Sequence, residues 1–149
     1  MINMFAVPDS QRAAVAIVTN PDREVLLQLR DDIAGIVHPG CWGFPGGSLE
    51  AGEDPLVAIK RELHEETGMH VKAARPLFEL VDALDDGGNG KLLTVFHIHY
   101  AGPVQDLVVG EGRELRFFPL SRLPSKVPSH VAEAVSRFLE DSAKPTVAQ

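Results

Sequence analysis

Capping residues mark both ends of one helix in the first half of the sequence, and this limits how the rest of the chain can fold. Asp54 is a helix-capping residue, and Pro55 after it has a fixed φ that suits the first helical position. Gly68 supplies the left-handed conformation with which helices often end. The apolar residues between them share one side of the helical wheel: Leu56, Ile59 and Leu63. The pattern predicts an amphipathic helix over residues 55–67.

Three carboxylates lie where this helix would least favour them. Glu62, Glu65 and Glu66 occupy its last turn and a half, and acidic groups near a helix C-terminus cost about 0.3–1 kcal/mol each. Glu62 and Glu66 add a like-charge pair four residues apart. A solvated acidic face is the ordinary interpretation, but it does not account for the clustering at the unfavourable end. A bound divalent cation would explain the clustering of the carboxylates, because Mg²⁺ is held by one or two carboxylates together with water and phosphate oxygens.

The rest of the chain alternates short β-type runs with turns. The runs expected as strands are 13–19, 24–29, 41–44, 69–74, 77–84, 91–100 and 114–120, and a second helix is expected over 129–141 with Ser129 as its cap. Pro45, Gly46 and Gly47 are expected to prevent regular structure and to let the backbone approach a ligand closely. Strands that come mostly as hairpins, with one helix between them and one at the end, predict an α/β protein: an α/β/α sandwich around a mixed sheet.

Length and charge narrow the class of protein further. The 149 residues suffice for a single domain, 1–149, with a frayed tail expected over 143–149. A formal net charge of −7 argues against a nucleic-acid polymer as partner, because such binding requires clustered cations. Cys41 is the only cysteine, which excludes an intrachain disulfide and favours a reducing compartment. Without a signal segment or a long apolar run, the expectation is a cytoplasmic protein with no membrane contact.

The segment over residues 47–69 resembles the Nudix box, G-x5-E-x7-R-E-U-x-E-E-x-G-U with U apolar. The sequence agrees with it at every defined position: Gly47, Glu53, Arg61, Glu62, Leu63, Glu65, Glu66, Gly68 and Met69. The likeness extends to the preceding "WGFPGG" and more loosely to the order of the expected strands. The resemblance implies the Nudix sandwich and hydrolysis of a nucleoside diphosphate linked to another moiety, with Mg²⁺ or Mn²⁺ as cofactor.

The resemblance also implies a set of metal ligands. Glu65 and Glu66 would be the principal ligands. Glu62 would be a further ligand or the base that activates water. The carbonyl of Gly46 resembles the backbone ligand of the family.

Supporting roles follow from the same alignment. Arg61 would orient the glutamates, and Glu53 would support the start of the helix. Many members draw one more carboxylate from a segment after the box. Glu114 is the preferred candidate for this metal ligand, and Glu111 is the alternative.

Substrate contacts are expected outside the helix. The glycine- and proline-containing loop over 30–40 flanks the box, so Asp31 and Asp32 are predicted to bind substrate. Phe117 is a third candidate, because adjacent strand residues face opposite ways and one of Phe117 and Phe118 can line a cleft. The loop over 30–40 and the hairpin tip over 85–90 lack apolar periodicity, and both are expected to be mobile without ligand.

Other residues carry weaker signals. His97 and His99 share a face of a strand, where lining a sheet edge or groove is the more ordinary role than binding metal. A core role is favoured for Trp42 over stacking on a base. The segment around Phe5 is compatible with a homodimer contact or with no contact at all.

Three functions are consistent with these observations. Hydrolysis of a small nucleotide at a P–O–P bond is favoured, with a nucleoside triphosphate or a nucleotide sugar as substrate. A nucleotide sensor without turnover is the alternative, although a pure binder has no need for the complete acidic set. An isomerase would need a dedicated acid or thiol, for which Cys41 is the only candidate found. The sequence has no "SQPWPFP"-like stretch of the NADH-cleaving members of the family, and no proline at the usual distance for the ADP-ribose-cleaving members.

Overall fold

A computed structural model describes residues 7–143 as one mixed sheet with a helix on each side. The elements in chain order are β1 (Arg12–Thr19), β2 (Glu24–Leu29), β3 (Trp42–Gly43), β4 (Gly46–Ser48), α1 (Pro55–Thr67), β5 (Arg75–Val81), β6 (Leu92–His99), β7 (Glu114–Pro119) and α2 (Ser129–Ala143), with three short 3-10 turns at Asp9–Gln11, Leu84–Asp86 and Val104–Asp106. The predicted helix over 55–67 is confirmed in its bounds. Residues 144–149 of the expected tail, and the segment around Phe5, lie outside the described residues.

The sheet has seven strands, and β1 lies at its centre. The order is β3-β2-β1-β6-β5, while β4 also pairs with β1 and β7 with β2. β1 runs parallel to β6 along its whole length and antiparallel to β2 and β4. The predicted hairpin between β5 and β6 is confirmed. The fold is therefore the mixed sheet that the sequence predicted.

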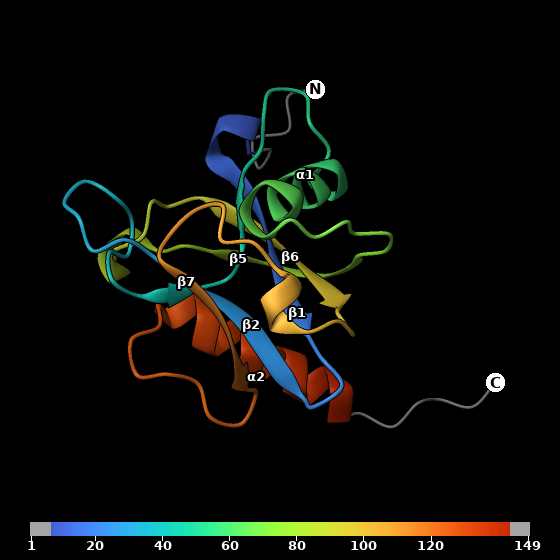
Figure 1. Cartoon of the computed structure of the whole chain (residues 1–149). Helices are drawn as coiled ribbons and strands as arrows, with labels where there is room; N and C mark the ends of the chain where they lie inside the picture. Colours follow the sequence, from blue (N-terminus) through green and yellow to red (C-terminus); the bar gives the residue numbers. More distant parts are fainter. Residues whose placement is uncertain (1–6, 144–149) are drawn as a thin grey trace.

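Alternate residues of β1 supply two separate cores. Ala13, Val15 and Ile17 pack on the α2 side, and the residues between them pack on the α1 side. Both faces of β1 are buried because each is covered by a helix. This explains why the sequence of the strand is almost continuously apolar. Figure 1 shows α1 and α2 on opposite sides of the sheet, which confirms the α/β/α sandwich.

Three sequence expectations on secondary structure are wrong. Residues 69–74 form no strand, since they cross from the end of α1 to β5 without a partner. Gly46–Ser48 do form a short strand, because Gly46 has no side chain and lets β4 lie against β1. A Cβ on Gly46 would lie 2.2 Å from the carbonyl oxygen of Ala14. Ser129 is inside α2, where its N–H and hydroxyl both donate to the Asp86 carboxylate.

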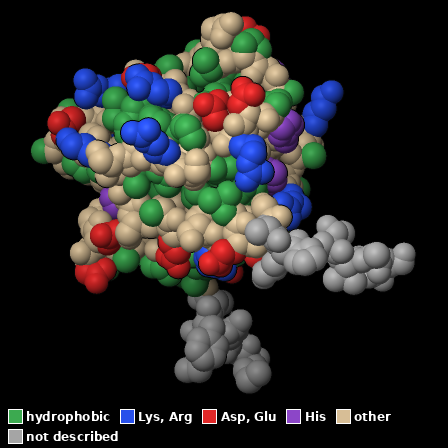
Figure 2. Space-filling model, turned by 90° about the horizontal axis from the view of Figure 1, so that it is seen from below, with side chains coloured by type: hydrophobic (Ala, Val, Ile, Leu, Met, Phe, Trp, Pro, Cys, Tyr) green, Lys and Arg blue, Asp and Glu red, His purple; other side chains and the backbone are tan. Residues whose placement is uncertain are grey.

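None of the helices in the described part of the chain is long and apolar enough to cross a membrane. The face in Figure 2 carries acidic and basic side chains interspersed with apolar ones, without a continuous basic stripe.

Candidate active site

The helix α1 begins and ends as its capping residues dictate. The Asp54 carboxylate accepts a hydrogen bond of 2.8 Å from the Leu56 N–H, and Gly68 adopts a left-handed φ of 74° while its N–H bonds to the carbonyl of His64. Ile59 and Leu63 are fully buried against the sheet. This packing fixes the rotation of the helix, and therefore which carboxylates face the cavity beside it.

Arg61 is the centre of an ion-pair network at the start of the box. Its guanidinium donates two hydrogen bonds of 2.8 Å to the Glu53 carboxylate and one of 2.8 Å to Glu62. It also donates to the backbone carbonyl of Ser48. Hydrogen bonding to Arg61 lowers the pKa of Glu53 to about 2. The predicted positioning role of Arg61 is therefore matched by its geometry.

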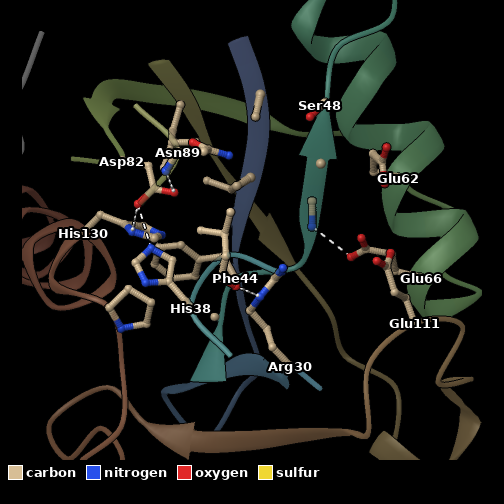
Figure 3. Close-up of a pocket in the computed structure, with 18 residues that line it drawn as sticks. Arg30, His38, Phe44, Ser48, Glu62, Glu66, Asp82, Asn89, Glu111 and His130 are labelled. Carbon is tan, nitrogen blue, oxygen red and sulfur yellow. Dashed lines mark hydrogen bonds and ion pairs between the residues drawn. The ribbon is translucent and has the colours of Figure 1, made fainter. Parts of the chain in front are cut away.

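Glu62 and Glu66 lie one turn apart and both line a cavity of about 380 Å³, drawn in Figure 3. The backbone of β4 lies directly against them, since a Cβ on Gly47 would be 2.5 Å from the Glu62 carboxyl carbon. The N–H of Gly46 donates a hydrogen bond of 3.0 Å to Glu66. Glu65 is not among the lining residues; its side chain is 56% exposed and lies 3.4 Å from Arg61.

Burial sets the protonation of the two inward carboxylates. The Glu66 residue is only 4% exposed, and burial raises its pKa to about 9, with Glu111 and Glu62 adding repulsion. Burial also raises the pKa of Glu62, although Arg61 opposes that shift. A cation would remove the cost of ionising these side chains, because it favours their charged forms.

Glu111 joins this acidic end through a loop that crosses the C-terminus of α1. The Val108 and Gly110 N–H groups donate to the carbonyls of Thr67 and Glu66, and the Gln28 side chain donates to the carbonyl of Glu111. Of the two candidates for the additional carboxylate, the structure thus places Glu111 in the cavity. The preferred choice, Glu114, lies outside this cavity, where its side chain pairs with Arg116 at 2.6 Å, so its position does not support the predicted role.

The opposite end of the cavity holds residues that the sequence analysis did not single out. Asn89 lines the cavity there, while Arg30 lies between the two ends and donates to the carbonyl of Val37. His38, Asp82 and His130 meet in one cluster and place one ligand atom each within 4.8 Å of the others. In the described part of the chain, no other group of three His, Cys, Asp or Glu residues does so. No sequence motif marked these three residues, which come from distant segments.

The predicted substrate-binding residues lie away from this cavity. Asp31 accepts a hydrogen bond from Gly40 through its carbonyl, and the Asp32 side chain lies against Gly40, so both belong to the base of the loop. Phe117 packs on the α1 side of the core, its ring 6.3 Å from that of Tyr100. Their role in substrate binding stays a prediction without support from their positions.

Aromatic and histidine side chains with weaker sequence signals have structural partners. Trp42 packs against the α2-side core with its ring 4.8 Å from Phe118, as the favoured core role requires. His97 bonds to Thr19 and packs against Phe138. The loop over 30–40 is held by polar contacts, since His38 is buried and bonded to Asp82.

The donor set at the acidic end fits a hard divalent cation. Glu62, Glu66 and Glu111 offer only oxygen, the ligand type that Mg²⁺ and Mn²⁺ prefer. They do not converge as closely as the histidine cluster. This is compatible with Mg²⁺, which keeps several waters and needs only one or two carboxylates.

A mixed sheet between two helices, with an acidic helix face beside a glycine-rich strand, defines the Nudix class of α/β proteins. A family model described as NUDIX domain matches residues 9–138, and the chain belongs to this family. The chain is similar to Nudix hydrolase 26, chloroplastic, of Arabidopsis thaliana (38% identity over 46% of this chain and 30% of the relative) and to the ADP-ribose pyrophosphatase of Methanocaldococcus jannaschii (29% identity over 78% and 68%). The crystal structure of a MutT NUDIX hydrolase from Burkholderia pseudomallei matches with a TM-score of 0.72 and 25% identity, covering 85% of this chain and 95% of the other.

The matched segment spans less than a third of the Arabidopsis protein.

Proposed function

We propose that this chain is a metal-dependent hydrolase that cleaves a P–O–P bond in a nucleoside diphosphate linked to another moiety. The observation that carries the proposal is the placement of Glu62, Glu66 and Glu111 at one end of a cavity, with Arg61 and Glu53 ordering the helix behind them. Membership of the NUDIX family supports the same reaction.

Glu62, Glu66 and Glu111 would hold Mg²⁺ or Mn²⁺, with Gly46 of β4 beside them. When bound, the cation supplies polarisation of the phosphoryl oxygens and lowers the pKa of water. Glu65 remains a candidate for an outer ligand that acts at the exposed rim of the helix.

Glu62 is proposed as the group that accepts the proton of the attacking water. Its carboxylate lines the same cavity as Glu66 and Glu111, where the attacking water would be activated. Arg61 holds Glu62 in place by a hydrogen bond of 2.8 Å, so it is a positioning residue. Arg30, in the middle of the cavity, and Asn89, beside Asp82, are placed to contact the rest of the substrate.

The proposed substrate is a small nucleotide, either a nucleoside triphosphate or a nucleotide sugar, and not a nucleic-acid polymer. The net charge of −7 supports the exclusion of a polymer. The likeness to an ADP-ribose pyrophosphatase adds ADP-ribose to the compounds worth assaying.

A cytoplasmic location and a homodimer are further proposals. The single cysteine supports the cytoplasmic location, because a reducing compartment favours free thiols.

The test is a panel of nucleoside triphosphates, nucleotide sugars and ADP-ribose, each incubated with Mg²⁺ or Mn²⁺. The expected result is release of a nucleoside monophosphate together with either pyrophosphate or the phosphorylated second moiety. Tight binding of a panel member without any product would favour the nucleotide sensor instead. Turnover that survives complete chelation of divalent metal would contradict the metal-dependent mechanism.

A further inference from the structure

We propose that His38, Asp82 and His130 form a second metal site, for a divalent transition ion of the zinc type, at the end of the cavity opposite the carboxylates. The inference does not rest on the proposed hydrolysis, because none of the three residues belongs to the acidic end. It rests on the convergence of two imidazoles and one carboxylate in a buried place (Figure 3).

The ligand atoms are close to the arrangement that such an ion requires. His38 Nε2 lies 2.8 Å and His130 Nδ1 3.4 Å from the same atom, Asp82 Oδ1. Zinc ligands lie about 2.0–2.2 Å from the ion, so neighbouring ligand atoms in tetrahedral coordination are about 3.4 Å apart. A shift of about half an ångström at His38 would therefore admit the ion. The cavity leaves room for a fourth ligand.

One of the nitrogen atoms lacks a hydrogen bond. His130 Nδ1 is buried from solvent and faces Asp82 Oδ1 at 3.4 Å without forming a hydrogen bond to it. A buried polar atom without a partner is costly, and such atoms are uncommon in folded proteins. The pairing of His38 with Asp82 leaves this cost in place, whereas a metal ion would bind all three atoms together.

The fold holds each ligand from a different segment. Asp82 follows β5, where its N–H and carbonyl bond to Lys91 and Gly90. Gly88 packs directly on its carboxylate, since a Cβ there would lie 2.2 Å from Asp82 Oδ1. His130 is in the first turn of α2. An ion at this point would tie the sheet, the helix and the loop over 30–40 together.

The backbone and the local charge also favour a cation. His38 is held at a positive φ of 51°, a conformation that costs energy in a residue other than glycine and is often found at functional sites. Asp86, which is exposed and bonded to Ser129, adds a second negative charge that interacts electrostatically with both histidines. Nitrogen ligands select zinc, cobalt or nickel over Mg²⁺, which prefers oxygen. The two ends of the cavity are thus chemically distinct.

The experiment titrates the full chain, purified without a polyhistidine tag, with Co²⁺ in excess Mg²⁺ that occupies the carboxylates. One Co²⁺ per chain should bind and give visible absorption bands typical of nitrogen ligation. His38→Ala and His130→Ala should each weaken this binding by on the order of 100-fold or more, since loss of an outer partner alone costs up to that much. His99→Ala, which removes an exposed histidine outside the cluster, should bind Co²⁺ as the wild type does.

X-ray absorption of the Zn²⁺-loaded wild type gives a second reading that needs no variant. Two imidazoles per zinc are expected. A shell of oxygen atoms alone, no uptake of Co²⁺ or Zn²⁺ in the presence of Mg²⁺, or undiminished uptake by both histidine variants would each overturn the proposal.

Discussion

Glu53 and Glu66 belong to the same short segment, yet their environments move their pKa values in opposite directions. Glu53 accepts two hydrogen bonds from Arg61, which keeps it ionised, with a pKa of about 2. Glu66 is enclosed by the sheet and by the loop that carries Glu111, and burial raises its pKa to about 9. The segment over 53–66 therefore holds one carboxylate that stays ionised and one for which burial favours the neutral form.

The kinetic prediction follows from this separation. Glu66→Gln should lower kcat by roughly 10²–10⁴, the range of a lost catalytic or metal function. Glu65→Gln should have a smaller effect, because Glu65 lies outside the cavity. Steady-state kinetics of both variants at saturating Mg²⁺ would measure the difference. Equal losses would show that the exposed carboxylate is as important as the buried one.

The raised pKa of Glu66 predicts a pH dependence in metal-free protein. Its folded pKa of about 9 lies above the unfolded value near 4.5, so the folded state binds the extra proton. The stabilisation is complete below about pH 4.5 and is lost as the pH rises through about 9. Thermal melts in chelator should show Tm falling over this window, and less steeply in Glu66→Gln. Mg²⁺ should restore Tm at high pH, because it binds only the folded, ionised site. Parallel curves for variant and wild type would contradict the assignment.

At the scale of elements, the site depends on what lies on the C-terminal end of α1. That end would be unfavourable for acidic residues, but its last carbonyls accept hydrogen bonds from Val108 and Gly110. The same two bonds bring Glu111 beside Glu66. One short loop therefore completes both the helix end and the carboxylate cluster.

Gly110 is the residue on which this loop depends. Gly110→Ala would put a Cβ 2.1 Å from the carbonyl oxygen of Glu65, so the loop must shift. We expect a loss of about 1–3 kcal/mol of stability, as in other overpacked sites, together with a lower kcat because Glu111 moves. Urea unfolding and kinetics would test both effects. Val109→Ala is the control, since Val109 is 46% exposed, and it should change neither.

At the scale of the whole molecule, the central strand β1 links the two halves of the sandwich. One of its faces packs under α2 and the other under α1, and its backbone pairs with β2, β4 and β6. The cavity combines residues from both sides, with Glu66 from α1 and His130 from α2. The geometry of the site therefore depends on the packing of the entire sheet.

Ile17 tests this dependence, because it is fully buried in β1 on the α2 side. Ile17→Ala should lower the free energy of unfolding by about 2–5 kcal/mol, the cost of a large cavity in a core. Val81→Ala, at a position that is 56% exposed, should cost far less. Urea unfolding of both variants would measure the two costs. A similar cost at the two positions would show that β1 is not the centre of stability.

The features that depend on residues close together in the chain could be predicted from the sequence. Helix α1 begins and ends where Asp54 and Gly68 predict, because capping and turn chemistry are local. Arg61 meets Glu53 and Glu62 as the box implies, since the three lie on or next to one helix. The fold class also followed from the order of strands and helices.

The contacts between distant segments depend on tertiary packing and could not be predicted from the sequence. Glu111 and not Glu114 reaches the cavity, because the loop crosses α1 before β7 begins. Residues 46–48 pair with β1 although glycine predicts irregular structure, because glycine is what allows so close an approach. The meeting of His38 with His130 depends on how the sheet brings the loop beside α2. Side-chain periodicity predicts which face of a helix or strand is buried, but it does not predict which other segment packs against that face.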